Sequence, residues 1–371
     1  MDFDLSDEQR LLQESAARYV GQRCSFEQWQ RWRGAGLQPG QELWPAFAEM
    51  GWLALPFGAD EGGLDGGPLE TMLLVQELGR GLVAEPYQQT VVQAGEVLRR
   101  CEPGALRTER IGALIQGRCR VAMACDELPA RYDRTYVQTS AERAAGRWRL
   151  RGTKAVVVGG DRADAFVVSA RGPEGLALFW VEAGAAGLGR RDYPLVDGGR
   201  GSELTLEDVV VDDGCRLSAA GQAEALLEHA TEAGLAALGA EALGLADLLL
   251  TQTLQYTRQR RQFGQALAQF QVLRHRMVDM YMQVEQLRSA VVLATLRLAE
   301  QHADTPRALS ALKVQVGKVG RFVSQQAVQL HGGMGMTDEI VVGHAFKRLL
   351  ALDAQLGNVD HHLRRFAALS A

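Results

Sequence analysis

Two stretches of the sequence carry residue types suited to binding phosphate groups. The first, YTRQRRQFG, runs from Tyr256 to Gly264 and holds three arginines where an apolar helical pattern ends. Arginine offers a fixed fork of donors that matches phosphate oxygens. Cations at a helix C-terminus also complement the helix dipole as a solvated cap. A phosphate clamp and a plain helix end are both open at this point.

The second stretch, QLHGGMGMTDEI, runs from Gln329 to Ile340. Gly332 and Gly333 follow a helical pattern, which is typical of a helix C-cap. Because glycine has no side chain, the pair would also let main-chain groups approach a diphosphate. The spacing differs from the Gly-x-Gly-x-x-Gly of a dinucleotide fold, and the segment follows a helix instead of a strand. The cluster alone does not decide between the two roles.

The remaining polar residues exclude several classes of function. The spacings of His331, His344, His361 and His362 match no usual zinc pattern, and the five cysteines are scattered without a C-x-x-C, so we predict neither a metal site nor a disulfide framework. The net charge of −5 argues against a nucleic-acid partner. The N-terminus has no signal-peptide pattern and no apolar run approaches the ~20 residues of a membrane span. A reducing cytoplasm is the expected location.

Three segments of different periodicity must position these residues. Residues 1–118 predict a helical domain, which starts with Ser6 as an N-cap. Residues 119–221 contain short β-branched runs at regular spacing, which predict a small antiparallel β domain or barrel. Residues 222–371 contain long helical patterns that predict a four-helix bundle. The expected fold class is therefore α+β, in the order α, β, α.

This order and several motifs together resemble the acyl-CoA dehydrogenase family over essentially the whole chain. The motifs are YTRQRRQFGQALAQFQVLRHRMVDM and QLHGGMGMTDEI, and VGHAFKRLLALDAQLGNVDHHL resembles the small-subunit branch typified by pimeloyl-CoA dehydrogenase. The resemblance implies the acyl-CoA dehydrogenase fold and FAD as cofactor. It also implies an acyl-CoA substrate that loses an α proton to a base and a β hydride to the flavin. Members form dimers or tetramers in which each FAD lies across two subunits, and electron-transfer flavoprotein is the expected electron acceptor.

The resemblance also assigns residues to the ADP arm of a neighbour's FAD. The matching positions, taken over one by one, are Arg260, Phe263 with Gly264, Gln271, Gln329, Gly332 and Gly333. On this basis the glycine pair would end a helix and contact the cofactor together.

The positions that surround the flavin ring in the family have changed. The segment DELPARYD, Asp126 to Asp133, stands where the family commonly has Thr-Glu-Pro-x-x-Gly-Ser-Asp, and only Glu127 and Asp133 agree. The anionic Asp126 replaces a threonine and is expected to disfavour the reduced ring. Val156 and Val158 replace the tryptophan that stacks near the flavin and the threonine beside its N5 atom.

The position of the catalytic base has changed as well. Ungapped counting places Leu356 where the commonest branch of the family has its glutamate, and Gly234 where a second branch has it. Neither residue can accept a proton. The remaining candidate bases are Glu232, Glu241 and Asp360. Glu232 would face away from the site, because two residues turn a helix by about 200°.

These losses favour the hypothesis that the chain is a base-lacking subunit of a heterotetramer with a catalytic sister. One alternative is a self-sufficient homo-oligomeric enzyme with an atypical base, and another is a non-catalytic protein that binds acyl-CoA. Resemblance suggests dicarboxylic or steroid-derived acyl groups, but the sequence does not identify the acyl chain. A terminal carboxylate would call for an arginine in the pocket, and the sequence alone does not place one.

Overall fold

The computed structural model describes residues 5–34 and 40–370. The N-terminal third is helical. Ser6 caps the first helix as expected: its Oγ accepts a hydrogen bond from the Gln9 amide at 3.2 Å, and the Gln9 side chain accepts one from the Ser6 amide at 3.0 Å. The main elements are α1 (Asp7–Arg23), α2 (Phe26–Gly34), α3 (Gly40–Glu49), α4 (Pro68–Arg80), the π-helical η2 (Gln88–Ala94), α5 (Gly95–Arg100) and α6 (Ala105–Ile115).

Seven strands then form one sheet. They are β1 (Val121–Ala124), β2 (Ser140–Ala144), β3 (Arg147–Val158), β4 (Ala165–Gly172), β5 (Gly175–Glu182), β6 (Leu188–Pro194) and β7 (Arg200–Asp212). The strand order is β1-β4-β2-β3-β7-β6, with β5 paired to β4. Four pairings are antiparallel, but β4 runs parallel to β1 and to β2, so the sheet is mixed and not wholly antiparallel as expected.

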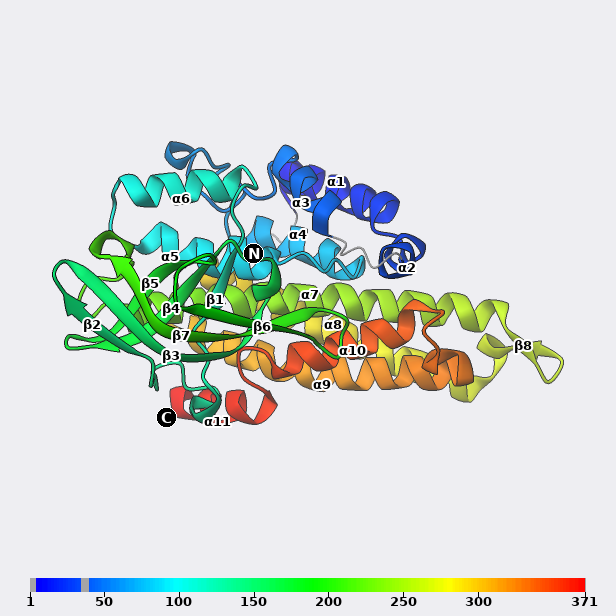
Figure 1. The fold of residues 1–371 in the computed structure, drawn as a ribbon. Coiled ribbons are helices and arrows are strands. Elements are labelled where there is room, and N and C mark those ends of the chain that lie inside the picture. The colour runs from blue at the N-terminus through cyan, green and yellow to red at the C-terminus, as the bar shows by residue number, and fades with distance from the viewer. Residues whose placement is uncertain (1–4, 35–39, 371) are drawn as a thin grey trace.

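The C-terminal region is a helical bundle. It comprises α7 (Ala223–Gln259), α8 (Gln271–Ala299), α9 (Thr305–His331), α10 (Val341–Ala354) and α11 (Val359–Ser370), with the hairpin β8 (Arg261–Gln262) and β9 (Gln265–Ala266) between α7 and α8. The expected bundle thus carries one further helix, α11, which packs on α9. Figure 1 shows the N-terminal helices above the long helix α7, the sheet at the left and the β8–β9 hairpin at the opposite, right-hand end of the bundle.

Helix α7 is the central helix of the fold. Among the described residues it is the one helix long and apolar enough by composition to cross a membrane, and 83% of its apolar window is buried inside the protein. A helix that is apolar on all sides belongs in a core. It contacts α4, α8 and α9. Gly244 allows the approach of α4, because a side chain there would meet the Gln76 carbonyl oxygen at 2.0 Å.

Candidate functional site

A cavity of about 660 Å³ lies where the sheet meets the bundle. Several separate segments line it, among them the loop after β1, the end of β3, η2, α7 and the turn after α10, which contribute Asp126, Val158, Gln93, Thr231 and Leu356. The fold therefore brings together residues that are far apart in sequence. Asp126, Val156 and Val158, at positions that the resemblance assigned to the flavin ring, line the same space as Leu356, one of the two positions assigned to the base.

The two candidate positions for a base are in contact. A Cβ atom built on Gly234 would lie 2.9 Å from Leu356 Cδ1 and 3.0 Å from the side chain of Gln93. Neither position supplies a carboxylate. Leu356 lines the cavity, and Gly234 lies against it.

The turn that carries Leu356 is firmly held. Leu356 adopts φ +55°, and the buried Lys313 ammonium donates to the carbonyl oxygens of Asp353 at 2.8 Å and Gly357 at 2.6 Å. His362 Nε2 lies 2.8 Å from the Leu356 carbonyl. Burial lowers the pKa of Lys313 to about 8 and that of His362 to about 4. These contacts hold Leu356 in a left-handed backbone conformation that L-residues rarely adopt, although its side chain cannot accept a proton.

The three candidate bases lie outside this cavity. Glu232 faces His229, with 3.6 Å between Oε2 and Nδ1, and burial raises its pKa to about 7. Glu241 is bound by the side chains of Arg348, at 2.9 Å from Nη2, and Gln88. Asp360 is exposed at the start of α11. Geometry alone thus keeps each of them from the space beside Leu356.

The charge of Asp126 is compensated by a residue that the sequence comparison missed. Arg134 donates from Nε to Oδ1 at 3.0 Å and from Nη2 to Oδ2 at 3.2 Å, and its Nη1 donates to Thr231 Oγ1 at 3.2 Å. This arginine therefore ties the loop to α7. An aspartate at a half-buried loop position called for a cation, but only the fold shows which one.

The family-matching Glu127 holds the same loop from behind. Its carboxylate accepts from the buried Lys154 ammonium at 2.7 Å and from the Thr139 hydroxyl at 2.7 Å. Asp133, the other match, accepts from the Thr135 amide at 3.0 Å. Both residues shape the loop by internal hydrogen bonds.

Two further arginines line the cavity. Arg131 is exposed and Arg365, on α11, pairs with Glu228. The sequence alone could not place an arginine here, because Arg365 comes from the last helix of the chain. The cavity lining thus carries both arginines and acidic residues, the latter being Asp126, Asp133, Glu224 and Glu228.

A second, smaller cavity adjoins the first. It measures about 350 Å³, and its lining shares Gln89, Val158 and Leu195 with the larger one. Arg348 crosses it, paired with Glu241 and, at 2.7 Å, with Asp197. The space behind Val158 is therefore crossed by a buried ion network.

The residues assigned to an ADP arm meet in a different place. Arg260, Gln329, Gly332 and Gly333 line an open groove of about 700 Å³ at the C-terminal ends of α7 and α9, together with Tyr256. Nothing lies within 4 Å of a Cβ position on either glycine, so the main chain there is accessible. Arginine donors beside bare main chain are suited to a diphosphate. We call this site the nucleotide groove.

Two of the assigned residues do not line the nucleotide groove. Phe263 lies at the tip of the β8–β9 hairpin and is 90% exposed. Gln271 is exposed at the first turn of α8. Both are exposed to solvent, next to Gln262 and Val272, which do line the groove.

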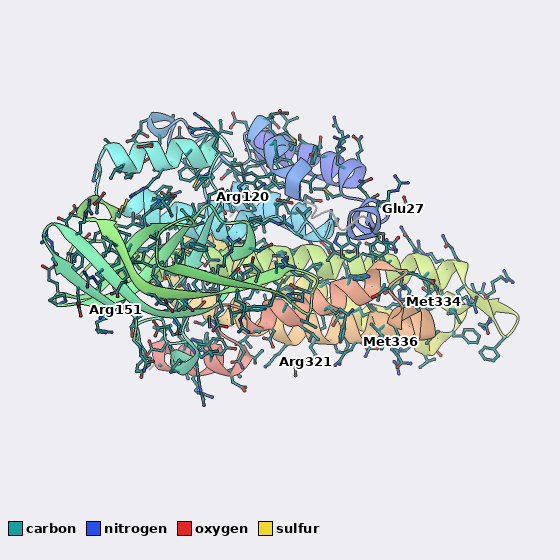
Figure 2. All side chains as sticks on the ribbon, in the orientation of Figure 1. Glu27, Arg120, Arg151, Arg321, Met334 and Met336 are labelled. Carbon is teal, nitrogen blue, oxygen red and sulfur yellow. The ribbon has the colours of Figure 1, made fainter. Side chains whose placement is uncertain are left out.

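The cavity and the nucleotide groove lie at opposite ends of α7. Thr231 lines the first and Arg260 the second, and a helical rise of about 1.5 Å per residue separates them by roughly 40 Å. In Figure 2, Met334, which lines the groove, lies beside the hairpin, and Arg151 of β3 lies at the other end of the molecule. One dinucleotide cannot contact both sites of the same chain.

No group of histidine, cysteine or acidic residues suited to a metal ion occurs in the part of the chain that the structure describes.

Comparison with known proteins matches both helical regions to one family. The model for the acyl-CoA dehydrogenase N-terminal domain matches residues 6–98, and that for the C-terminal domain matches residues 223–368. A short-chain-specific acyl-CoA dehydrogenase of Megasphaera elsdenii is 29% identical over 292 residues, 76% of each protein. The structure is similar to a chain of the ChsE4-ChsE5 complex from Mycobacterium tuberculosis (26% identity, TM-score 0.91, covering 99% and 98%) and to PigA with FAD and proline (25%, 0.93, 100% of both).

Proposed function

Since this chain belongs to the acyl-CoA dehydrogenase family, oxidoreductases that act on acyl-CoA with FAD, we propose that it is the base-lacking subunit of a heteromeric acyl-CoA dehydrogenase. In this role it grips the ADP arm of an FAD whose ring lies in a catalytic sister chain. The sister supplies the base for the α proton.

One observation carries the proposal. The two positions at which the family places its base lie against each other and are Leu356, which lines the cavity, and Gly234. None of the three alternative bases that the sequence offered lines the cavity. A general base must come within hydrogen-bond reach of the proton that it removes. Four other acidic residues do line the cavity, namely Asp126, Asp133, Glu224 and Glu228. Of these, Asp126 is paired with Arg134 and Glu228 with Arg365.

The residues of the nucleotide groove fit the ADP arm of FAD, whereas the residues at the flavin-ring positions do not fit the ring. In the ring half, Val158 has no donor to offer, and the Asp126 carboxylate is held by Arg134. These side chains do not fit a flavin that must gain electron density, so we derive no step there. In the nucleotide groove, Arg260 and the open main chain at Gly332 and Gly333 fit a diphosphate.

Within the assembly this chain's task is binding. Arg260 would donate to the diphosphate oxygens, with Gln329 and the glycine main chain completing the contact. The bound FAD supplies the acceptor for the substrate's β hydride. The roughly 40 Å between groove and cavity requires that a dinucleotide held in the groove place its ring in another chain.

The proposal extends to partners and substrate. The structural relative named ChsE4-ChsE5 is a complex of two different chains, which supports a heteromeric assembly. We propose electron-transfer flavoprotein as the acceptor, a cytoplasmic location, and a dicarboxylic or steroid-derived acyl-CoA as substrate. Arg131, which is exposed at the cavity, is the arginine that we propose for a carboxylate-bearing ligand, since Arg365 is paired with Glu228.

The test compares the chain alone with the chain co-purified with its sister from the source cells. Flavin is counted per chain from the visible spectrum, and acyl-CoA oxidation is measured. We expect a colourless, inactive chain alone and an active assembly with half as many flavins as chains. In the assembly, Arg260→Ala should reduce flavin content, and Arg258→Ala should not, because Arg258 is exposed on the same helix outside the groove.

The proposal fails if the chain alone holds one flavin per protomer and oxidises an acyl-CoA at an ordinary rate.

A further inference from the structure

Glu85 is a buried acid whose carboxylate receives no hydrogen bond. It lies between α4 and η2 and lines the smaller cavity, and its side chain is fully buried. Neither Oε1 nor Oε2 accepts a hydrogen bond from a described residue. Arg162 Nη1 approaches Oε1 to 3.5 Å, which is an ion pair without a hydrogen bond, and burial raises the pKa of the Glu85 carboxyl. Because burying a carboxylate without donors is unfavourable, a ligand that donates to Glu85 would complete this wall of the cavity.

The charges that line the smaller cavity leave one carboxylate in excess. Arg348 pairs with both Asp197 and Glu241. Arg162 is shared as well, since its Nε lies 3.9 Å from Asp161 Oδ2. Among the described residues, the lining has four carboxylates and three arginines, which are Glu85, Asp161, Asp197, Glu241, Arg162, Arg200 and Arg348. A ligand with a single positive charge would balance this set.

The smaller cavity has room for a short carbon chain beside Glu85. Its volume of about 350 Å³ lies at the lower end of the range of small-molecule pockets. Leu82, Val83 and Pro86 add apolar groups to the lining, and Trp29 of α2 lines the same space. An indole ring attracts a cation that approaches its face. The cavity therefore suits a ligand that is apolar along its body and positively charged at one end.

We propose that the smaller cavity binds an alkylammonium group, whose N–H groups donate to the Glu85 carboxylate while its carbon chain lies against the apolar part of the lining. This site goes beyond the proposed function, which assigns no ligand to the smaller cavity, and it does not depend on the subunit role. Two sources share this chemistry. One is a free alkylamine. The other is the far end of an acyl chain that extends from the larger cavity, because the two linings share Gln89, Val158 and Leu195.

Calorimetry with the full chain at neutral pH tests the site, with hexylamine as the probe and 1-hexanol as its uncharged match. The wild type should bind hexylamine about tenfold to a hundredfold more tightly than 1-hexanol, because a hydrogen bond between charged groups is stronger than one made by a hydroxyl. Glu85→Gln keeps the shape of the side chain and removes its charge, so it should remove most of this preference. Glu109→Gln, at an exposed position of α6 outside the cavity, should leave the preference unchanged.

A second pair of probes distinguishes the two sources. ω-Aminohexanoyl-CoA and heptanoyl-CoA have acyl chains of the same length, which end in an ammonium group and a methyl group respectively. A preference for the amino thioester that Glu85→Gln removes would assign the site to the end of an acyl chain, and an amine would then replace the dicarboxylic or steroid-derived group in the proposed substrate. Binding of hexylamine without such a preference among the thioesters would assign the site to a free amine.

Equal affinities of the wild type for hexylamine and 1-hexanol would overturn the proposal, and this comparison does not depend on whether a variant folds. A preference for hexylamine that Glu85→Gln retains would overturn it as well, since the amine would then lie elsewhere. Neither result bears on the subunit role, which flavin counting in the co-purified assembly tests separately.

Discussion

Replacing Gly234 by alanine tests whether the two base positions converge as the structure shows. The new methyl group would lie 2.9 Å from Leu356 Cδ1 and 3.0 Å from Gln93 Cγ and Cδ, closer than real Cβ atoms normally approach. Overpacking of this kind costs about 1–3 kcal/mol. Replacing glycine by alanine inside a helix returns about 0.5–1 kcal/mol. We therefore expect Gly234→Ala to destabilise the chain by about 1 kcal/mol.

The same substitution should change sign once Leu356 is shortened. In a Leu356→Ala background the nearest atom is removed, and the flexible Gln93 side chain, which supplies the other two close contacts, can turn aside. Gly234→Ala should then stabilise the chain by about 0.5 kcal/mol, which gives a coupling of about 1–2 kcal/mol between the two sites. Urea unfolding of the wild type, both single variants and the double variant measures it.

A matched control uses a helical glycine with free space around it. Nothing lies within 4 Å of a Cβ position on Gly112 of α6. Gly112→Ala should stabilise by about 0.5–1 kcal/mol and combine additively with Leu356→Ala. If Gly234→Ala and Leu356→Ala also combined additively, the two positions would not meet, and the main support for the base-lacking role would be lost.

Three further predictions concern the surroundings of the cavity. Arg134→Ala should lower the free energy of unfolding by about 1–2 kcal/mol, and the double variant with Asp126→Ala should recover part of the loss, as judged by urea unfolding. The pKa of Glu232 is about 7 in the folded chain and near 4.5 when unfolded, so its contribution to stability is lost as pH rises from about 4.5 to 7. Unfolding at a series of pH values should show a fall of up to about 3 kcal/mol that Glu232→Gln removes, and an unchanged slope in the variant would refute the assignment. Lys313→Met should cost about 2–4 kcal/mol, because two carbonyls of the turn that carries Leu356 lose a buried charged donor, and it should speed hydrogen exchange in that turn.

Local periodicity was enough to predict the order of the elements. The apolar pattern of α7 and the alternating pattern of β7 indicate a helix and a strand without further information. The parallel pairing of β4 with β1 could not be predicted in this way, because alternation describes the faces of a strand and not the direction of its neighbour. The prediction of an antiparallel sheet failed for this reason.

The sequence predicted the relative directions of those site residues that lie on the same helix. The 200° turn between Glu232 and Gly234 predicted that Glu232 faces away from the site, and in the structure it faces His229. The partner of Asp126 was not predictable. Arg134 is eight residues further along the chain, and only the conformation of the loop between them brings the two side chains together. Lys313 was missed for a similar reason: only the packing of α9 against the end of α10 brings its ammonium to the turn.

The length of α7 also has a consequence for how substitutions accumulate in this chain and for the effects that they have. With roughly 40 Å of rigid helix between them, its two ligand regions can accumulate substitutions independently. Catalytic residues at the cavity can therefore be lost while the residues of the nucleotide groove are kept. Under the subunit role proposed above, a substitution in the groove would lower the flavin content of the sister chain, and loss of activity would map to either of two genes.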